Sequence, residues 1–359
     1  MRIGFFAPTL NRVGGGELIA LNMIRALQNK GHRIIVYTAE KTNRSHIQEF
    51  LGYDLSFDEI GIGPNIFDPY AFENIYPNAL KSYLLKLKCD LLIDTFSNSV
   101  LPWTDVIYFQ GNSRIVKLPR GFEGVLFAPY KYYVLSADKQ VEKKVLLTCS
   151  MENAKKIRDS VGLNVRVVYP PVSSFFKIHN NAHPKDNTVV TVARISNDKR
   201  PETIPLIAKL ILEKNVSFTI VGNCRTPNEQ RTLRNLLSSL RKHGVEKKVK
   251  LLLNVSREKQ REVLQKAKIY LHPFVPYESF GLSAVEAMSA GCVPIVPDVG
   301  GLKEIVPEQL RYNSVEGAAA LVDSSLGNWT ESEPQDYVRI ADRFSPEEFY
   351  QNFLKYMPS

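Results

Sequence analysis

The chain has 359 residues, of which 44% are hydrophobic and 10% aromatic. This composition excludes a disordered or fibrous protein, and the length favours two domains, each with its own core. The net charge of +9 suits phosphate-bearing ligands, an anionic membrane surface or nucleic acid, although solubility alone would also explain it.

The start of the chain, MRIGFF, is not a signal-peptide pattern, and no apolar run approaches the roughly 18 residues of a membrane span. We therefore expect a cytoplasmic protein. The four cysteines lie far apart without CxxC spacing, so we predict neither a metal site nor a disulfide framework.

Short apolar runs recur along the first half of the chain. The first run, IGFFA, leads through a glycine-rich loop into a helical pattern, ELIALNMIRALQNKG, that ends at Gly31. Further runs are RIIVYTA, LLIDT, VIYF, KVLLTCS and VRVVY. Strands that alternate with helical segments in this way predict an α/β domain with a parallel sheet.

The glycine-rich loop GGGE (14–17) lies between the first strand and its helix. Glycine lets a backbone approach a ligand closely, and the N–H groups of a helix start attract anions, so Gly15 and Gly16 are candidate ligand contacts. Simple turn chemistry is the alternative. The loop lacks the GxGxxG spacing of a dehydrogenase, and Glu40 after the second strand does not supply that fingerprint.

Segment 108–144 interleaves tyrosine and phenylalanine with seven Lys or Arg against three Asp or Glu. Aromatic rings suit lipid headgroups, and cations suit a polyprenyl phosphate or diphosphate. The segment is therefore a candidate acceptor-side or membrane-facing surface. A buried helix with a solvated basic face is the alternative.

A polar stretch, HNNAHPKDN, interrupts the pattern, and a second series of apolar runs follows: TVVTVAR, SFTIVGN, VKLLLN, KIYLHPF and VPIVP. Helical patterns such as PETIPLIAKLILEK and EQRTLRNLLSSLRKHG separate them. We predict a first Rossmann-like domain (1–178), a linker (179–187), a second doubly wound domain (188–333) and two C-terminal helices (334–359) that pack back towards the first domain. A ligand site is expected at the carboxyl ends of the strands, in a cleft between the domains.

The segment PYESFGLSAVEAM places two glutamates around one helix start. An apolar strand ends at HPF, a turn carries Glu278, and Gly281 opens a helix that bears Glu286. The N–H groups of residues 281–284 lack acceptors inside the helix and favour an anion such as a diphosphate. Glu286 could accept hydrogen bonds from ribose, and Glu278 from sugar hydroxyls. A helix cap or a solvated charge is the alternative for either glutamate alone.

ESFGLSAVEAM resembles the motif of the retaining GT-B glycosyltransferases of family 4 (group 1), in which two glutamates with seven residues between them enclose an FG pair and the second glutamate begins EAM. The resemblance implies two Rossmann-like domains and a nucleotide-diphosphate sugar as donor. It assigns the donor sugar to Glu278 and the ribose to Glu286. The further donor contacts that it implies lie around the helix start: Phe280, Gly281, Leu282 and Ser283.

A second segment, VARISNDKRPE, carries Arg194 and Lys199 at the spacing of the family's arginine and lysine that bind the diphosphate, with Ala193 where the family usually has glycine. Two cations can neutralise a departing nucleoside diphosphate, a role otherwise taken by a metal ion. We therefore predict Arg194, Lys199 and Glu278 as catalytic residues and expect no cofactor or metal. An ordinary basic loop is the alternative.

Other segments resemble the family less specifically. They are GGGE near the reacting sugar, VVYPPV (167–172), IVGN with Gly222, the pair Ser256 and Arg257 where the family reads the base, and VGGLKEIV with Gly300, Gly301 and Glu304. None of them names the base, so GDP-, UDP- and ADP-linked donors all stay open.

Gln110 is the main departure from the family. Many members have a histidine at the end of the strand written here as VIYFQ. Glutamine can hydrogen-bond a sugar or acceptor hydroxyl but cannot take up a proton near neutral pH. A structural role at the strand end, or lost activity, are the alternatives. His272 is expected to pack within its strand.

We therefore predict a metal-independent, retaining hexosyltransferase that moves mannose or glucose to a glycan or polyprenyl-linked acceptor. Peripheral association with the cytoplasmic face of an anionic membrane is a further possibility, and nucleic acid is not expected as a partner. The alternatives are a nucleotide-sugar epimerase or phosphorylase of the same fold, and a non-catalytic protein that binds sugar nucleotides or nucleic acid.

Overall fold

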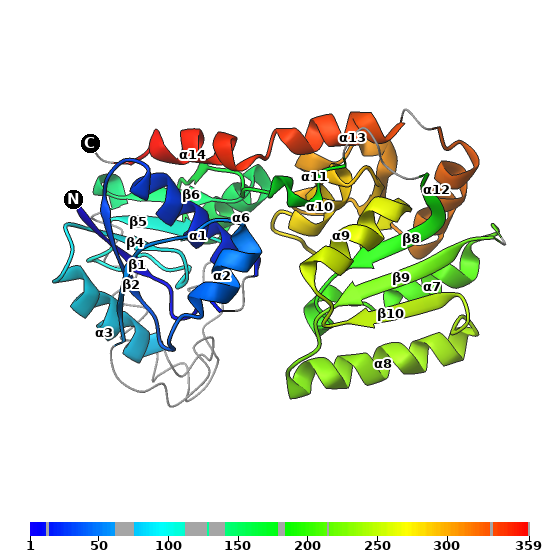
Figure 1. Ribbon diagram of the computed structural model, residues 1–359, viewed down its shortest axis with the longest axis horizontal. Coiled ribbons are helices and arrows are strands. Elements are labelled where there is room, and N and C mark those ends of the chain that lie inside the picture. Colours follow the sequence, from blue (N-terminus) through cyan, green and yellow to red (C-terminus); the bar gives the residue numbers. More distant parts are fainter. Residues whose placement is uncertain are drawn as a thin grey trace. The chain divides into compact units, whose positions relative to one another are not determined.

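The computed structural model describes residues 1–11, 14–61, 75–111, 128, 141–178, 184–213, 215–330 and 333–357. The chain divides into two compact domains. The first contains Met1–Pro171 together with Pro346–Ser359, and the second contains Val172–Ser345. Each domain is built on one parallel β-sheet flanked by helices (Figure 1).

The first sheet has the strand order β3-β2-β1-β4-β5-β6-β7, and all of its strand pairs are parallel. The side chains of β4 and β5 are all buried, as expected for parallel strands covered on both faces. The strands are β1 (Arg2–Phe6), β2 (Arg33–Tyr37), β3 (Asp58–Ile60), β4 (Leu91–Asp94), β5 (Val106–Phe109), β6 (Val145–Thr148) and β7 (Arg166–Val167).

The helices of the first domain are α1 (Gly15–Gln28), α2 (Arg44–Leu51), α3 (Ile75–Lys86), α6 (Met151–Val161) and α14 (Pro346–Leu354). The C-terminal helix α14 packs on α1, at the other end of the chain (Figure 1). The hydroxyl of Tyr350 on α14 donates a hydrogen bond to Asn22 Oδ1 on α1 at 3.0 Å. Phe349 and Phe353 are buried on the same helix, so α14 completes the core of this domain.

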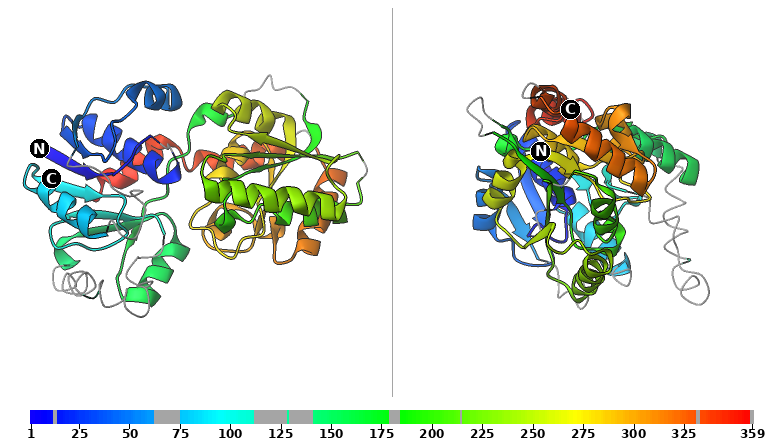
Figure 2. Two further views of the ribbon diagram at one scale, coloured as in Figure 1. Left: turned by 90° about the horizontal axis from the view of Figure 1, so that it is seen from below. Right: turned by 90° about the vertical axis from the view of Figure 1, so that its right-hand side faces the viewer.

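The second sheet has the order β10-β9-β8-β11-β12-β13, again with parallel pairs. Figure 2 shows helices on both faces of this sheet. The strands are β8 (Asp186–Val192), β9 (Ser217–Gly222), β10 (Val249–Leu253), β11 (Ala267–Leu271), β12 (Val293–Pro297) and β13 (Arg311–Tyr312). The helices are α7 (Thr203–Leu210), α8 (Pro227–His243), α9 (Arg257–Lys266), α10 (Leu282–Ser289), α11 (Leu302–Ile305), α12 (Val315–Gly327) and α13 (Glu333–Asp342). The expectation of two doubly wound α/β domains is confirmed.

The contacts divide the chain at a different place from the sequence pattern. The division falls after Pro171 rather than after residue 178, because the Val172 N–H donates to Phe344 O within the second domain and the short helix Ser174–Phe176 packs on α9 and α10. The end of the expected linker, from Asp186, already belongs to β8. Of the two C-terminal helices, α13 packs on α10 in the second domain, and only α14 joins the first.

The helical pattern at 201–214 also ends earlier than expected. Helix α7 stops at Leu210, and the chain becomes extended at Ile211. The carboxylate of Asp323 accepts hydrogen bonds from the backbone N–H groups of Leu212 and Glu213. This tertiary contact replaces the last helical turn.

Lys185 connects the C-terminal ends of two helices. Its ammonium donates to three backbone carbonyls: Gln265 O at 3.1 Å and Ala267 O at 2.9 Å at the end of α9, and Ala290 O at 2.9 Å at the end of α10. The last carbonyls of a helix lack partners inside the helix and carry the negative end of its dipole. One ammonium thus donates hydrogen bonds to carbonyls at the ends of both helices.

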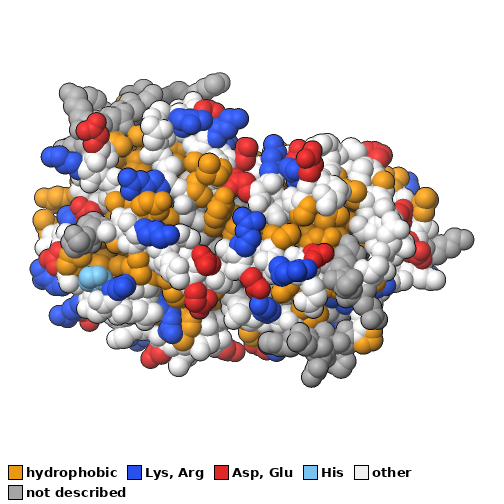
Figure 3. Space-filling model, turned by 90° about the horizontal axis from the view of Figure 1, so that it is seen from above, with side chains coloured by type: hydrophobic (Ala, Val, Ile, Leu, Met, Phe, Trp, Pro, Cys, Tyr) orange, Lys and Arg blue, Asp and Glu red, His pale blue; other side chains and the backbone are white. Residues whose placement is uncertain are grey.

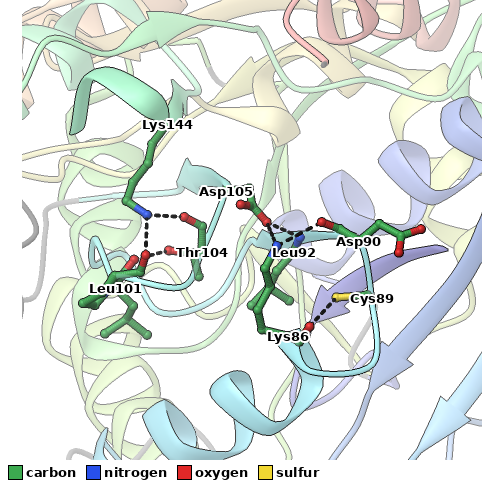
Figure 4. Close-up of polar contacts among 9 residues, drawn as sticks. Lys86, Cys89, Asp90, Leu92, Leu101, Thr104, Asp105 and Lys144 are labelled. Carbon is green, nitrogen blue, oxygen red and sulfur yellow. Dashed lines mark hydrogen bonds and ion pairs between the residues drawn. The ribbon is translucent and has the colours of Figure 1, made fainter. Parts of the chain in front are cut away.

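A cluster of polar side chains lies in the first domain, at the end of the sheet where strands β4, β5 and β6 begin. Figure 4 shows Asp105 beside Lys86 and Leu92. Asp105 Oδ2 lies 2.6 Å from Lys86 Nζ and accepts the Leu92 N–H at 2.7 Å. Lys144 Nζ donates to Pro102 O and Thr104 O nearby. The cluster fixes the turn between β4 and β5.

Replacing Asp105 by alanine is expected to lower the free energy of unfolding by about 2 kcal/mol, because the partly buried Lys86 ammonium loses its counterion and the Leu92 N–H loses its side-chain acceptor. Urea denaturation measures the change. Asp159→Ala is the matched control, since Asp159 is exposed and lies 3.8 Å from Arg158. The control should change stability by less than about 0.5 kcal/mol. Equal effects of the two substitutions would contradict the role of the cluster.

In the part of the chain that the structure describes, no helix is both long enough and apolar enough to cross a membrane.

Candidate functional site

The main group of polar side chains in the second domain lies at the point where the strand order of its sheet reverses, between β8 and β11. Strands β8 and β11 are neighbours, but the chain continues from them to opposite sides of the sheet. In open parallel sheets this switch point leaves a crevice at the carboxyl ends of the strands. The loop that follows β8 carries Arg194 and Lys199, and the loop that follows β11 carries His272 and Glu278.

Glu278 is the centre of this group. Its side chain is 13% exposed, and Oε2 lies 2.5 Å from Lys199 Nζ and 3.5 Å from His272 Nε2. Burial alone would raise the pKa of Glu278, but the Lys199 ammonium and His272 hold that pKa well below its usual range. The carboxylate is therefore charged at neutral pH.

His272 is oriented by the backbone. Its Nδ1 lies 2.9 Å from Pro273 O, so Nδ1 carries a proton and donates to this carbonyl. That leaves Nε2 directed at Glu278. The ring is buried and packs edge-on against Tyr270 at 6.2 Å.

Two glycines fix the backbone around Glu278. Gly300 has φ +53°, and a Cβ at this position would lie 1.9 Å from Glu278 O. The next residue, Gly301, donates its N–H to the same carbonyl at 2.9 Å. Gly281 has φ +107° and precedes α10 with no room for a Cβ beside Leu302. Only glycine fits these close approaches.

Helix α10 begins directly after this turn. The backbone N–H groups of Leu282 and Ser283 have no acceptor within the helix, as expected for its first residues. The Ala284 N–H, which the sequence pattern left without a partner, instead donates to Gly281 O at 3.0 Å, because the first turn of the helix closes tightly. The Ser283 hydroxyl lies 2.8 Å from that of Tyr270.

Glu286 lies one turn into α10, next to α9. Gln260 Nε2 donates to Glu286 Oε2 at 3.4 Å. Burial raises the pKa of Glu286 to about 7, although the charge of Arg257 and the hydrogen bond from Gln260 oppose the rise. The Arg257 guanidinium itself lies over the rings of Phe175 and Phe176, 4.6 and 5.0 Å from their centres.

Arg194 is exposed and lies 3.3 Å from Asp198 on its own loop. Gly222, at the end of β9, allows this loop to approach closely, because a Cβ there would lie 2.5 Å from Ala193 O and 2.8 Å from the Ile195 side chain. Gly222 therefore supports the loop that carries Arg194 and Lys199.

The first domain has a small pocket at its own switch point, between β1 and β4. It has a volume of about 90 Å³. Its lining consists of Ala7, Thr9, Leu10, Gly16, Glu17, Ala20, Thr95, Phe96, Asn98 and Gln110. The Gln110 side chain donates from Nε2 to Thr95 O at 2.5 Å, and its Oε1 lies where a Cβ on Gly16 would come within 2.1 Å. Gly16 is thus required for Gln110 to occupy this place.

Residues 173–330 match the family model described as glycosyl transferases group 1. The match covers most of the second domain and less than half of the whole chain. The matched residues include all of the site in the second domain, from Arg194 to Glu286.

Curated proteins that are similar to this chain carry the name GDP-Man:Man(3)GlcNAc(2)-PP-Dol alpha-1,2-mannosyltransferase. The Xenopus laevis protein is 29% identical over 52% of this chain and 42% of its own length. The Dictyostelium discoideum protein is 21% identical over 99% of this chain and 84% of its own length. The chain spans less than half the length of the frog and mouse relatives that it matches.

Solved structures share the whole fold. Anabaena HepE in complex with UDP and glucose superimposes with a TM-score of 0.75 at 15% identity, over 99% of this chain and 98% of that chain. A glycosyltransferase from Rickettsia africae has a TM-score of 0.74, also at 15% identity, over 99% and 97% of the two chains. The GT-B fold is confirmed.

The structure brings only some of the candidate residues together. Lys199 and Glu278 are in direct contact, and Glu286 lies near Arg257. The remaining candidates have other neighbours: Phe280 is buried against Phe344, the Ser256 hydroxyl caps α9 by accepting the Lys259 N–H, and Gly15 begins α1 in the first domain. A donor contact from Phe280 would therefore have to come from its backbone.

Sequence reasoning missed two features of the site. His272 was expected only to pack in its strand, yet its Nε2 faces Glu278. The hydroxyl of Ser196, in the loop with Arg194 and Lys199, is buried and has no hydrogen-bond partner within the described residues. Such a hydroxyl is unusual in a folded protein and is typical of a ligand contact. Most of the aromatic and basic segment 108–144 lies outside the described residues.

Glu286→Gln is expected to raise the free energy of unfolding by about 2 kcal/mol near pH 8. The usual pKa of the carboxyl is 4.5, and the fold raises it to about 7. Between these values the folded state keeps a proton that the unfolded state has lost, so the stability due to Glu286 falls as pH rises through this window and stays low above it. Thermal unfolding at pH 4.5 and near pH 8 tests the prediction.

The amide should stabilise the protein near pH 8 and have little effect at pH 4.5. Glu308→Gln is the control, because this side chain is 93% exposed. If Glu286→Gln changed stability equally at both pH values, the raised pKa would not be its cause.

Proposed function

We propose that the protein transfers a hexose, with retention of anomeric configuration and without a metal ion, from a nucleotide-diphosphate sugar to a glycan or lipid-linked glycan. One observation carries this proposal: the charged Glu278 carboxylate is held by Lys199 and His272 at the switch point, directly before the start of α10. The names of the relatives, which include a GDP-mannose donor and a dolichol-linked acceptor, support the same reaction class.

In this proposal the diphosphate binds at the start of α10, with Arg194 and Lys199 as its counterions. Backbone N–H groups and two cations can balance the charge that develops on a leaving diphosphate. The unpartnered Ser196 hydroxyl is available to donate to a phosphate oxygen. Glu286 accepts from the ribose hydroxyls, and its pKa near 7 predicts tighter nucleotide binding as pH rises towards neutrality.

Glu278 accepts hydrogen bonds from the donor sugar and stabilises positive charge on its anomeric carbon. The acceptor hydroxyl forms the new C–O bond as the bond to the phosphate breaks, and its proton passes to the departing phosphate oxygen. Gln110 and the pocket around it are assigned to sugar or acceptor hydroxyls. An amide is sufficient there because the phosphate, not residue 110, takes the proton.

A donor screen tests the assignment. Thermal unfolding with GDP-mannose, UDP-glucose and ADP-glucose should identify one nucleotide sugar that stabilises the protein by mass action. Arg194→Ala should lose most of that stabilisation, whereas Glu308→Gln should keep it. With an acceptor, release of nucleoside diphosphate should persist in EDTA, and NMR of the product should show the donor's anomeric configuration.

Each alternative predicts a different outcome. An epimerase would act on the donor without an acceptor, and a non-catalytic protein would bind the donor without turnover. A protein that binds nucleic acid usually has a continuous basic patch on its surface. On the face drawn in Figure 3, basic and acidic side chains are interspersed.

A further inference from the structure

Helix α3 exposes a stripe of large apolar side chains. Tyr76, Leu80, Tyr83 and Leu87 are 39, 58, 43 and 65% exposed. Their spacings of four, three and four residues place them on one side of the helix. We call these four residues the α3 stripe. The other large apolar side chains that are exposed among the described residues are scattered over separate elements, from Met1 to Leu237.

The fold does not need this stripe. A different side of α3 packs on the first sheet through Asn78, Ser82 and Leu85, which are all buried. Leu85 belongs to the core cluster with Phe6, Tyr37 and Leu92. An amphipathic helix normally turns polar residues to the other side. Apolar residues kept on that side cost solubility, and a contiguous exposed group of them marks an interaction surface.

The chemistry of the surface favours a lipid interface. Trp103 packs edge-on against Tyr83 at 5.4 Å, and its indole N–H donates to Ser82 Oγ. Tyrosine and tryptophan place an apolar ring and a polar tip at the level of lipid headgroups, with leucines reaching the acyl boundary. The sequence of α3 and its last turn, residues 75–88, contains three lysines and no acidic residue.

The three lysines of this segment differ in their surroundings. Lys88 is exposed beside Leu87, and Lys81 is half-buried with its ammonium 5.6 Å from the centre of the Tyr37 ring. Lys86 is paired with Asp105. An anionic lipid surface attracts the exposed Lys88 ammonium, whereas a neutral surface does not.

We propose that the α3 stripe, with the exposed Lys88 beside it, docks this protein on an anionic bilayer surface. This inference rests on the proposed function only in that a lipid-linked acceptor gives the docking its purpose. α3 is labelled at the lower left of Figure 1. The partner is the bilayer surface itself, not the acceptor.

Vesicle cosedimentation tests the proposal. The native protein should bind phosphatidylcholine vesicles that contain about one third phosphatidylglycerol, and bind pure phosphatidylcholine vesicles at least about fivefold more weakly. The double variant Leu80→Ser/Leu87→Ser should lose at least about tenfold in partitioning. Lys88→Gln should lose severalfold. Leu212→Ser is the matched control, since Leu212 is 83% exposed in the second domain, and it should bind as the native protein does.

Unchanged binding by the double serine variant would overturn the proposal, as would a native protein that binds neither kind of vesicle. Gel filtration adds a second check: a dimer that the double substitution converts to a monomer would assign the stripe to a second copy of the chain instead. Donor-induced thermal stabilisation of the same variants separates the two proposals. Lost vesicle binding with intact donor binding concerns the α3 stripe alone, and the reverse concerns the proposed function alone.

Discussion

Glu278→Gln is expected to reduce turnover by about 100-fold or more while the protein remains folded. The substitution keeps the shape of the side chain but removes the negative charge that faces Lys199 and His272. Both the sugar contact and the charge opposite the anomeric carbon then weaken in the transition state. Nucleoside diphosphate release measures kcat, and thermal shift with the nucleotide measures binding.

The nucleotide should still bind, because in the proposed site its contacts come from Arg194, Lys199 and the start of α10. Glu308→Gln serves as the control for a carboxylate removed from an exposed position. Equal kcat for native protein and Glu278→Gln would remove Glu278 from the reaction.

Gly300→Ala is expected to lower turnover by a similar factor without touching any charged group. A Cβ at this position would lie 1.9 Å from Glu278 O, and the φ of +53° disfavours any side chain. The Glu278 backbone must therefore move, and a displacement of about 1 Å at a reacting group costs about 100-fold. Gly327→Ala is the matched control, because a Cβ there has no neighbour within 4 Å.

Thermal unfolding of Gly300→Ala, measured together with its activity, distinguishes a displaced Glu278 from an unfolded protein. We expect the folded protein to survive with stability lowered by about 2 kcal/mol. A folded variant with native turnover would mean that the loop at Gly300 does not set the position of Glu278.

The sequence predicted the parts of the fold that rest on apolar runs. Runs such as LLIDT and VIYF became central strands because parallel strands buried on both faces need continuous apolar residues. β3 and β13, with the sequences DEI and RY, were missed because edge strands of two or three residues carry no such signal. The domain boundary was displaced because it depends on tertiary contacts, among them the hydrogen bond from Val172 to Phe344 and the packing of Ser174–Phe176 on α9 and α10.

At the candidate site, too, local sequence signals predicted the structure and tertiary contacts did not follow from the sequence. The motif around Glu278 predicted a helix start at Gly281 because glycine and the helical pattern are local signals. The approach of His272 to Glu278 was not predictable, since it depends on the path of the chain between residues 273 and 277. The α3 stripe was missed for a different reason: the sequence alone does not show which side of a helix with several large apolar residues is buried.

Lys185 determines how α9 and α10 can move. If α9 or α10 tilted alone, the hydrogen bonds from the Lys185 ammonium to the carbonyls of that helix would stretch. We therefore expect the two helices to move as one rigid unit. Arg257 and Glu286, on these two helices, would then keep their spacing when the unit moves. Arginine could not replace Lys185, because a planar fork cannot serve three carbonyls that converge on a single point.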